Sequence, residues 1–197
     1  MIQSWFPTLI YSENLSNRFG ESFNSSIYSR LLEIKKEHEK TKDWNCGTYT
    51  TLGIENINLF EEKYFSELLD VCKEHVEIFS EEMLVDKKYK LTCKDYWGNI
   101  ASPGDFQERH THINSQFSLV YYVKTPENCG DIVFYSPRSE ECLTIPTRDG
   151  NYSNYMYCTY KAVQSNVIIF RSNVPHMVKQ NNSKENRCSI AMNFNYN

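Results

Sequence analysis

The sequence has no excess of basic residues, since 21 lysines and arginines stand against 25 aspartates and glutamates and the formal net charge is -4. It also has no basic run interleaved with aromatics, so nothing in it predicts a nucleic-acid partner, whose phosphates would be met by positive charge. No stretch approaches the roughly 18 consecutive apolar residues of a membrane span, and the first residues lack the basic and apolar regions of a secretion signal. We therefore expect neither a membrane span nor secretion.

Paired cysteines are missing as well. The seven cysteines are scattered from Cys46 to Cys188, are odd in number and form no C-x-x-C pair. This pattern argues against both a disulfide framework and a structural zinc site. We expect free thiols and a cytoplasmic, reducing environment.

No internal repeat and no Pro/Gly/Ser-rich linker divides the chain, and its 197 residues are enough to bury a core. We expect a single domain of residues 1–197. Within it, residues 1–87 are predicted to be mainly helical support, and residues 88–197 are predicted to form a β-rich core.

Apolar residues recur at helical spacing in two N-terminal segments, 22–40 and 58–84, which follow a short extended start. Asn58, with Glu61 three positions later, is the expected N-cap of the second helix. The apolar positions are Phe23, Ile27, Leu31 and Ile34 in the first segment and Leu59, Tyr64, Leu68, Leu69, Val71, Val76 and Phe79 in the second.

From about Lys88 the pattern changes to short segments rich in β-branched and aromatic residues, separated by turn formers. Examples are "QFSLVYYVK", "GDIVFYSP", "NVIIFRS" and "RCSIAMNFNYN". Their spacing predicts an antiparallel sandwich or barrel packed against the two helices. The fold class is therefore α+β, mainly β.

Two of the five histidines, His110 and His112, are only two residues apart. In an extended chain they share one face, and two neutral imidazoles can bind a divalent metal such as Fe, Zn, Cu or Ni. A third histidine, His176, lies in another candidate strand. A lone H-x-H is more often a surface feature, and we read His38 and His75, which sit among charges on the helices, as solvent-facing.

The last candidate strand begins with Arg187 and carries Ser189 on the same face. An arginine that faces the interior is costly unless an anion satisfies it. A guanidinium fork with a neighbouring hydroxyl suits a carboxylate. Taken alone, Arg187 could equally be a surface charge at a turn, but the histidines favour the anion site.

The ordered set His110-Thr-His112, His176 and Arg187-Cys-Ser189 resembles the signature of the Fe(II)/2-oxoglutarate-dependent oxygenases. The chain is most similar to the small bacterial and phage family of these enzymes, distant relatives of the prolyl 4-hydroxylases. The resemblance extends from the opening "WFPTLIY" through residues 96–138 to the ending "PHMVKQNNSKENRCSIAMNFN". It implies a double-stranded β-helix, also called a jelly roll or cupin-like fold, buttressed by the N-terminal helices.

The resemblance also implies the roles of the site residues. His110, His112 and His176 would hold Fe(II), Arg187 and Ser189 would bind the far carboxylate of 2-oxoglutarate, and the Tyr122 hydroxyl would assist. The superfamily places a carboxylate where this chain has His112, so Glu108, or less plausibly Asp131, stays open as an alternative metal ligand.

Three further residues have weaker expectations. Trp97 and Asn99 match a tryptophan–asparagine pair of the family, and we expect Trp97 to be ordinary core packing. Asn193 shares the face of Arg187 and Ser189, so it either lines the pocket or is a plain strand position.

The resulting hypothesis is an Fe(II)- and 2-oxoglutarate-dependent dioxygenase that uses O2, releases succinate and CO2, and hydroxylates a peptide side chain or a small molecule. One alternative is a cupin-type metalloenzyme that does not use 2-oxoglutarate, and another is a non-catalytic jelly-roll binding module. A homodimer, formed through the extended N-terminal segment, also stays open.

Overall fold

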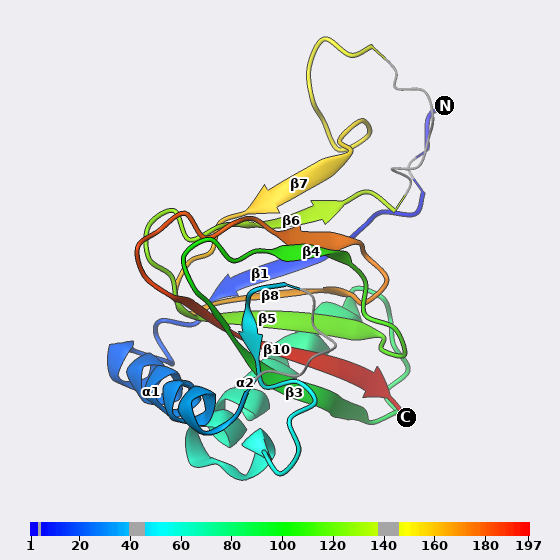
Figure 1. The fold of residues 1–197 in the computed structure, drawn as a ribbon. Coiled ribbons are helices and arrows are strands. Elements are labelled where there is room, and N and C mark those ends of the chain that lie inside the picture. The colour runs from blue at the N-terminus through cyan, green and yellow to red at the C-terminus, as the bar shows by residue number, and fades with distance from the viewer. Residues whose placement is uncertain (4, 40–45, 138–145) are drawn as a thin grey trace.

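The computed structural model describes residues 1–3, 5–39, 46–137 and 146–197; Arg138 and Cys142 lie outside these ranges. The described chain contains two long helices, one short 3-10 helix and ten strands (Figure 1). The helices are α1 (Glu21–Glu37), η1 (Leu59–Glu61) and α2 (Lys63–Glu81). The strands are β1 (Ile10–Asn14), β2 (Tyr49–Thr50), β3 (Leu91–Ala101), β4 (Gln107–His110), β5 (Phe117–Lys124), β6 (Ile132–Tyr135), β7 (Tyr157–Tyr160), β8 (Asn166–Arg171), β9 (His176–Val178) and β10 (Arg187–Tyr196).

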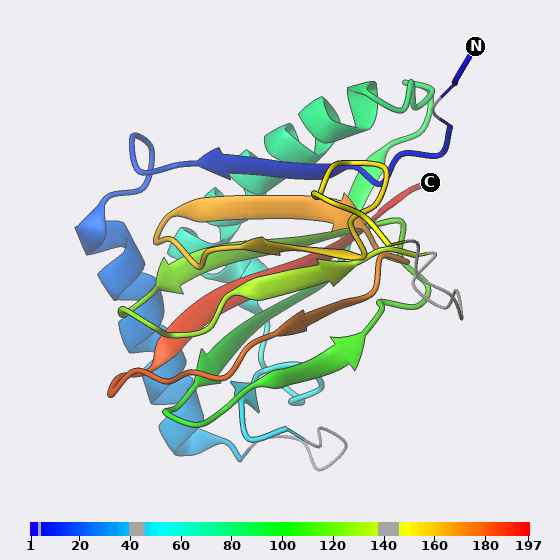
Figure 2. The same cartoon turned by 90° about the horizontal axis from the view of Figure 1, so that it is seen from above.

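The strands form two antiparallel sheets that face each other. The larger sheet has the order β1-β8-β5-β10-β3-β2 and the smaller has the order β4-β9-β6-β7. Figures 1 and 2 show the smaller sheet lying over one face of the larger sheet, while both helices cover the other face. A small apolar cluster between the sheets contains Tyr122, Ile132, Phe134, Ile168, Phe170 and Val174.

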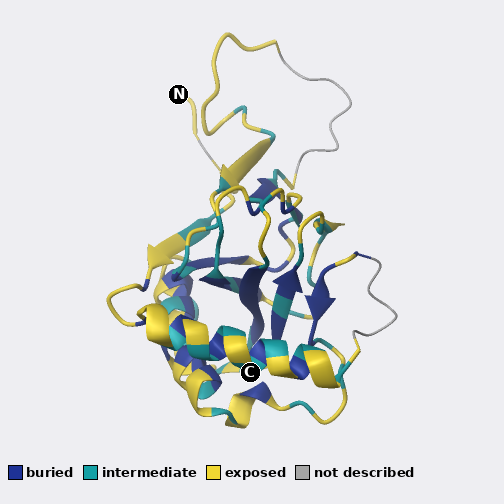
Figure 3. Ribbon diagram, turned by 60° about the vertical axis from the view of Figure 1, so that its left-hand side comes forward, coloured by how far each residue is buried: buried dark blue, intermediate teal, exposed yellow. Residues whose placement is uncertain are grey.

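The main hydrophobic core lies between the larger sheet and the helices. Ile27, Leu31 and Ile34 are buried on α1 at the predicted helical spacing, and α2 buries Leu68 and Val76 among others. Each such side chain removed from water contributes roughly 1.5–3 kcal/mol. Figure 3 shows the result, because the sheet interior is buried while the outer helix surfaces are exposed. The predicted mainly β protein with two helices is confirmed.

Several details differ from the sequence expectations. Asn58 caps η1 and not the long helix, because its side chain accepts a hydrogen bond from the Phe60 N–H and donates one to Glu61, whereas α2 begins at Lys63. His75 is half-buried, and its Nδ1 lies 2.7 Å from the Tyr11 hydroxyl, so it is not solvent-facing.

The N-terminal part of the chain supplies strands as well as helices. β1 pairs with β8 and β2 pairs with β3, so these two strands form the edges of the larger sheet. The extended N-terminal segment is therefore paired within its own chain. A homodimer stays a prediction.

Strand β10 lies near the middle of the larger sheet, between β3 and β5. Side chains of a strand alternate between the two faces of its sheet. Cys188, Ile190, Met192 and Phe194 belong to the core on the helix side. Arg187, Ser189, Ala191 and Asn193 consequently face the smaller sheet. Because this alternation predicts Cys188 as a core residue, its complete burial confirms the expected strand register.

Candidate metal centre and anion pocket

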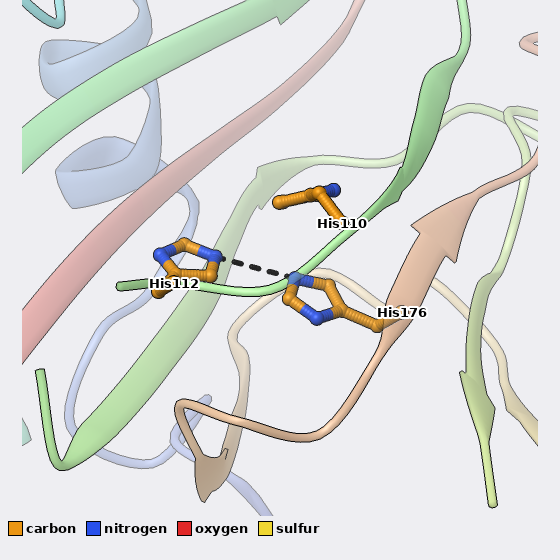
Figure 4. A group of neighbouring side chains, drawn as sticks. All are labelled: His110, His112 and His176. Atoms are coloured by element: carbon orange, nitrogen blue, oxygen red, sulfur yellow. Dashed lines mark hydrogen bonds between the residues drawn. The ribbon is translucent and has the colours of Figure 1, made fainter. Parts of the chain in front are cut away.

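Three histidines meet between the two sheets. His110 is the last residue of β4, His112 follows it by two residues, and His176 is the first residue of β9, directly paired with His110. One ring nitrogen from each lies within 4.8 Å of the others. The Nε2 atoms of His112 and His176 are 3.3 Å apart (Figure 4). The structure thus brings the three histidines of the sequence analysis together, and their nitrogens could hold a metal ion.

Backbone carbonyls fix two of the three rings. The Nδ1 of His110 lies 2.7 Å from the Glu108 carbonyl oxygen, and the Nδ1 of His176 lies 3.0 Å from that of Val174. A carbonyl only accepts hydrogen bonds, so each Nδ1 must carry the proton and donate it. In each of these two rings Nε2 is then the nitrogen without a proton, which is the form that metal ligation requires.

The surroundings keep the three imidazoles neutral. Burial lowers the pKa of His176 to about 3 and that of His112 to about 4, and the neighbouring histidines add to both effects. Burial also lowers the pKa of His110. The Asn193 amide and the charge of Asp95 act in the opposite direction on His112. At neutral pH the rings are thus in the protonation state that binds metals.

The H-x-H motif lies at the end of strand β4. The motif does not begin a strand, because β4 ends at His110 and His112 lies in the segment after it. A register shift between Gln107 and His110 breaks the simple alternation of β4. Glu108 is therefore exposed, while Gln107 and His110 both line the pocket.

No carboxylate joins the histidine group among the described residues. Glu108 stays outside for the reason just given. Asp131 is engaged elsewhere, since its side chain accepts a hydrogen bond from the Ala162 N–H, and its charge acts on Arg187. The described structure therefore places His112, and neither Glu108 nor Asp131, beside the other two histidines, while the identity of the metal ligands stays a prediction.

The histidines share one pocket with the predicted anion-binding residues. Arg187, Ser189 and Tyr122 lie on β10 and β5, with Ser189 paired to Tyr122 across the strands. The lining residues are Thr48, Trp97, Asn99, Gln107, His110, His112, Leu119, Val120, Tyr122, Ile132, Phe170, His176, Val178, Arg187, Ser189 and Ala191. The structure thus brings all six predicted site residues to one place.

Arg187 is a buried cation that has no ionic partner among the residues that the structure describes. It is 5% exposed, and its Nη1 donates to the carbonyl oxygens of Cys129, Gly130 and Lys179 at 2.5, 3.1 and 3.4 Å. In the described chain, its Nε and Nη2 make no hydrogen bond and no carboxylate forms an ion pair with it. Burial of a charge in this way is costly unless an anion compensates it.

The hydroxyl of Tyr122 is similarly unsatisfied. Tyr122 is 2% exposed, and its oxygen has no hydrogen-bond partner among the described residues. Burial raises the pKa of its phenol, so the group stays a neutral hydrogen-bond donor. Buried polar groups are normally hydrogen-bonded, so this hydroxyl calls for a partner such as a water molecule or a ligand atom.

Sequence reasoning missed two features of the pocket. Trp97 does not pack in the helix-side core, because its ring lies 5.8 Å from the His112 ring and lines the pocket with Asn99. Trp97 and Asn99 are two positions apart on β3, and this spacing predicts that their side chains share one face of the sheet. Gln107 and Thr48 also line the pocket, and no feature of the sequence pointed to them.

Several solved structures share this fold. A prolyl-4-hydroxylase from Pseudomonas putida has a TM-score of 0.66 and 13% identity, over 96% of this chain and 94% of its own. A prolyl hydroxylase from Trichoplax adhaerens, in complex with a hypoxia inducible factor peptide fragment, has a TM-score of 0.62 and 14% identity over 94% and 82%. HygX from Streptomyces hygroscopicus, with nickel, 2-oxoglutarate and hygromycin B bound, has a TM-score of 0.62 and 10% identity over 95% and 82%.

These similarities confirm the predicted double-stranded β-helix. A sequence search of curated proteins found no match. The model of the family described as "Putative 2OG-Fe(II) oxygenase" matches residues 95–193, half of the chain, and this range contains the three histidines, Tyr122, Arg187 and Ser189. The chain belongs to the 2OG-Fe(II) oxygenase family, whose members use Fe(II), 2-oxoglutarate and O2.

Proposed function

We propose that His110, His112 and His176 hold the Fe(II) ion of this oxygenase and that Arg187, Ser189 and Tyr122 bind its 2-oxoglutarate. The observation that carries the proposal is a buried guanidinium, which has no ion pair among the described residues, in the same pocket as three clustered histidines. One end of the pocket suits a metal cation and the other suits a carboxylate. A dicarboxylic acid that also chelates a metal satisfies both ends.

The carbonyls around Arg187 support the proposed carboxylate site by orienting the fork. They occupy Nη1 and leave the N–H groups of Nε and Nη2 for a bidentate contact with a carboxylate. The Tyr122 hydroxyl supplies a further donor, and so does Ser189. These donors would replace the water that a carboxylate loses on entering the pocket.

A neutral set of three imidazoles is chemically suitable for Fe(II), although it lacks the negative charge of a carboxylate ligand. When bound, iron and 2-oxoglutarate together would supply the oxidising power, with succinate and CO2 as products of the cosubstrate. The protein would orient the metal and the cosubstrate and would exclude water with an apolar pocket wall. Phe170, Val120 and Ile132 form much of that wall.

We further propose that the reaction is hydroxylation of a peptide side chain or a small molecule. Structural neighbours have been solved with a hypoxia inducible factor peptide and with hygromycin B, which illustrates both substrate classes on this fold. No helix in the described ranges combines the length and the apolar character that crossing a membrane requires. A cytoplasmic location stays a prediction, which the six free cysteines of the described chain support.

The test is anaerobic titration with Fe(II), with and without 2-oxoglutarate, followed by visible charge-transfer absorption. The proposal expects a band that needs iron and 2-oxoglutarate together, is lost in His176→Ala and is weakened in Arg187→Met. Arg171→Met, at an exposed arginine of β8, is the matched control and should leave the band unchanged. Iron binding without a band, and without an effect of Arg187→Met, would favour the cupin-type alternative. Failure to bind iron at all would favour the non-catalytic module.

A further inference from the structure

Three buried polar residues form a small network on the pocket side of the larger sheet. Ser118, Ser172 and Asn193 are 1%, 0% and 6% exposed and come from β5, the segment after β8, and β10. Asn193 pairs with Ser118 on one side and with Asp95 on the other. Buried polar side chains carry a desolvation cost, so a cluster inside an apolar layer calls for a reason.

The hydrogen bonds of the network have a defined direction. Asn193 Nδ2 donates to Asp95 Oδ2 at 3.0 Å, which fixes the amide orientation because a carboxylate only accepts. Asn193 Oδ1 accepts from the Ser118 hydroxyl at 2.9 Å. That hydroxyl has a single proton, so the 2.8 Å contact between Ser118 and Ser172 must be donated by Ser172.

Both ends of His112 touch this network. The backbone N–H of His112 donates to the Ser172 carbonyl at 2.9 Å. The Asn193 amide also acts on the ring of His112, where it raises the pKa of the imidazole against the larger effect of burial. Figure 4 shows that the second ring nitrogen of His112, Nδ1, points away from His176.

His112 needs such a partner more than the other two histidines do. His110 and His176 each donate Nδ1–H to the carbonyl of the residue two positions earlier. Among the described residues, no backbone carbonyl takes this role for His112, which lies outside the strands.

We propose that Asn193 is a positioning residue, which accepts the Nδ1–H of His112 and is itself held by Asp95, so that Nε2 of His112 stays free for the metal. The inference rests on the proposed metal site. In this arrangement the carboxylate of Asp95 acts on the metal site indirectly, because it polarises the Asn193 amide toward the ring of His112. The three-histidine set thereby regains part of the negative charge that it lacks.

The test uses the full-length, metal-free protein first. In ¹⁵N-edited NMR at neutral pH, His112 should show the Nδ1–H tautomer in the unmodified protein and a mixture in Asn193→Leu. Zn²⁺ affinity, measured by competition with a chelating dye, should fall about 10- to 100-fold in Asn193→Leu. The matched control is Asn24→Leu, because Asn24 is equally buried and hydrogen-bonds Ser165 and Tyr121 far from the histidines.

A double variant separates positioning from simple packing. Asn193→Asp combined with Asp95→Asn exchanges the amide and the carboxylate, which preserves the acceptor for His112 and the donor between the two strands. We expect it to restore the tautomer and most of the Zn²⁺ affinity. If Asn193→Leu behaves like Asn24→Leu in both measurements, the positioning role is refuted. If His112→Ala keeps full Zn²⁺ affinity, the metal site itself is refuted, whatever Asn193 does.

Discussion

Replacement of Arg187 by methionine should remove most of the affinity for 2-oxoglutarate while sparing ligands without the second carboxylate. Methionine has similar length and no charge. The lost contacts are the two N–H groups on Nε and Nη2 that the backbone carbonyls leave available. A hydrogen bond to a charged group contributes about 1.5–3 kcal/mol, so a bidentate pair is worth about 3–6 kcal/mol. This corresponds to a dissociation constant weakened about 10²- to 10⁴-fold.

The assay is isothermal titration calorimetry with the Ni²⁺-loaded protein, which removes turnover from the measurement. Two ligands are compared: 2-oxoglutarate and 2-oxopentanoate, which has the same chain length but no distal carboxylate. Arg187→Met should weaken only the first, and Arg171→Met should weaken neither. Equal losses for both ligands would show that the substitution merely disturbs the pocket. An unchanged affinity for 2-oxoglutarate would refute the assignment of Arg187 as its receptor.

Three further predictions follow from the pocket. Gly130→Ala should lower the free energy of unfolding and weaken 2-oxoglutarate binding more than Gly104→Ala, as chemical denaturation and calorimetry would show. Both glycines have a φ near +90°, but only at Gly130 would a Cβ lie 2.2 Å from the Lys179 oxygen and 2.8 Å from Arg187. Tyr122→Phe should raise the free energy of unfolding of the ligand-free protein by about 1 kcal/mol, since a buried hydroxyl without a partner among the described residues is removed. The same substitution should weaken the affinity for 2-oxoglutarate about fivefold. Equal changes in the stability of the ligand-free and the 2-oxoglutarate-bound protein would contradict this prediction. Burial lowers the pKa of His112 to about 4 in the folded protein, whereas an unfolded histidine takes up its proton near pH 6.5. Between these two pH values the unfolded metal-free chain binds more protons than the folded one. The free energy of unfolding, measured with urea, should therefore fall from pH 6.5 toward pH 4 by roughly 1.4 kcal/mol per pH unit for each such histidine. A flat profile would argue against neutral, buried rings.

Much of the fold and of the site could be predicted from local patterns. Strand alternation alone assigned Arg187 and Ser189 to one face and Cys188 to the other, because a buried strand at the centre of a sheet has little freedom to change register. The helical spacing of Ile27, Leu31 and Ile34 reflected a single buried face. The order of the histidines along the sequence indicated a metal site. The pairing of β4 with β9 then brings His110 next to His176.

Other features depended on contacts that no local pattern contains. The register shift in β4 turned Glu108 outward, and a shift of this kind cannot be located from alternation. Two of the carbonyls that hold Arg187 come from Cys129 and Gly130, which are 58 and 57 positions away in the sequence. The Tyr11–His75 contact likewise joins residues 64 positions apart.

The two faces of β10 are both buried but have different neighbours, which has a consequence for how substitutions are tolerated along the strand. From residue 187 to 194, neighbouring positions have different surroundings, because one face of the strand is turned toward the histidine pocket while the other packs in the helix-side core. A saturation scan that records cellular abundance and turnover separately would produce two profiles with the same period, displaced by one residue. Odd-numbered positions would lose turnover at near-normal abundance, and even-numbered positions would lose abundance first. Alternate positions of one strand would thus be constrained separately, one set by the activity of the protein and the other by its stability.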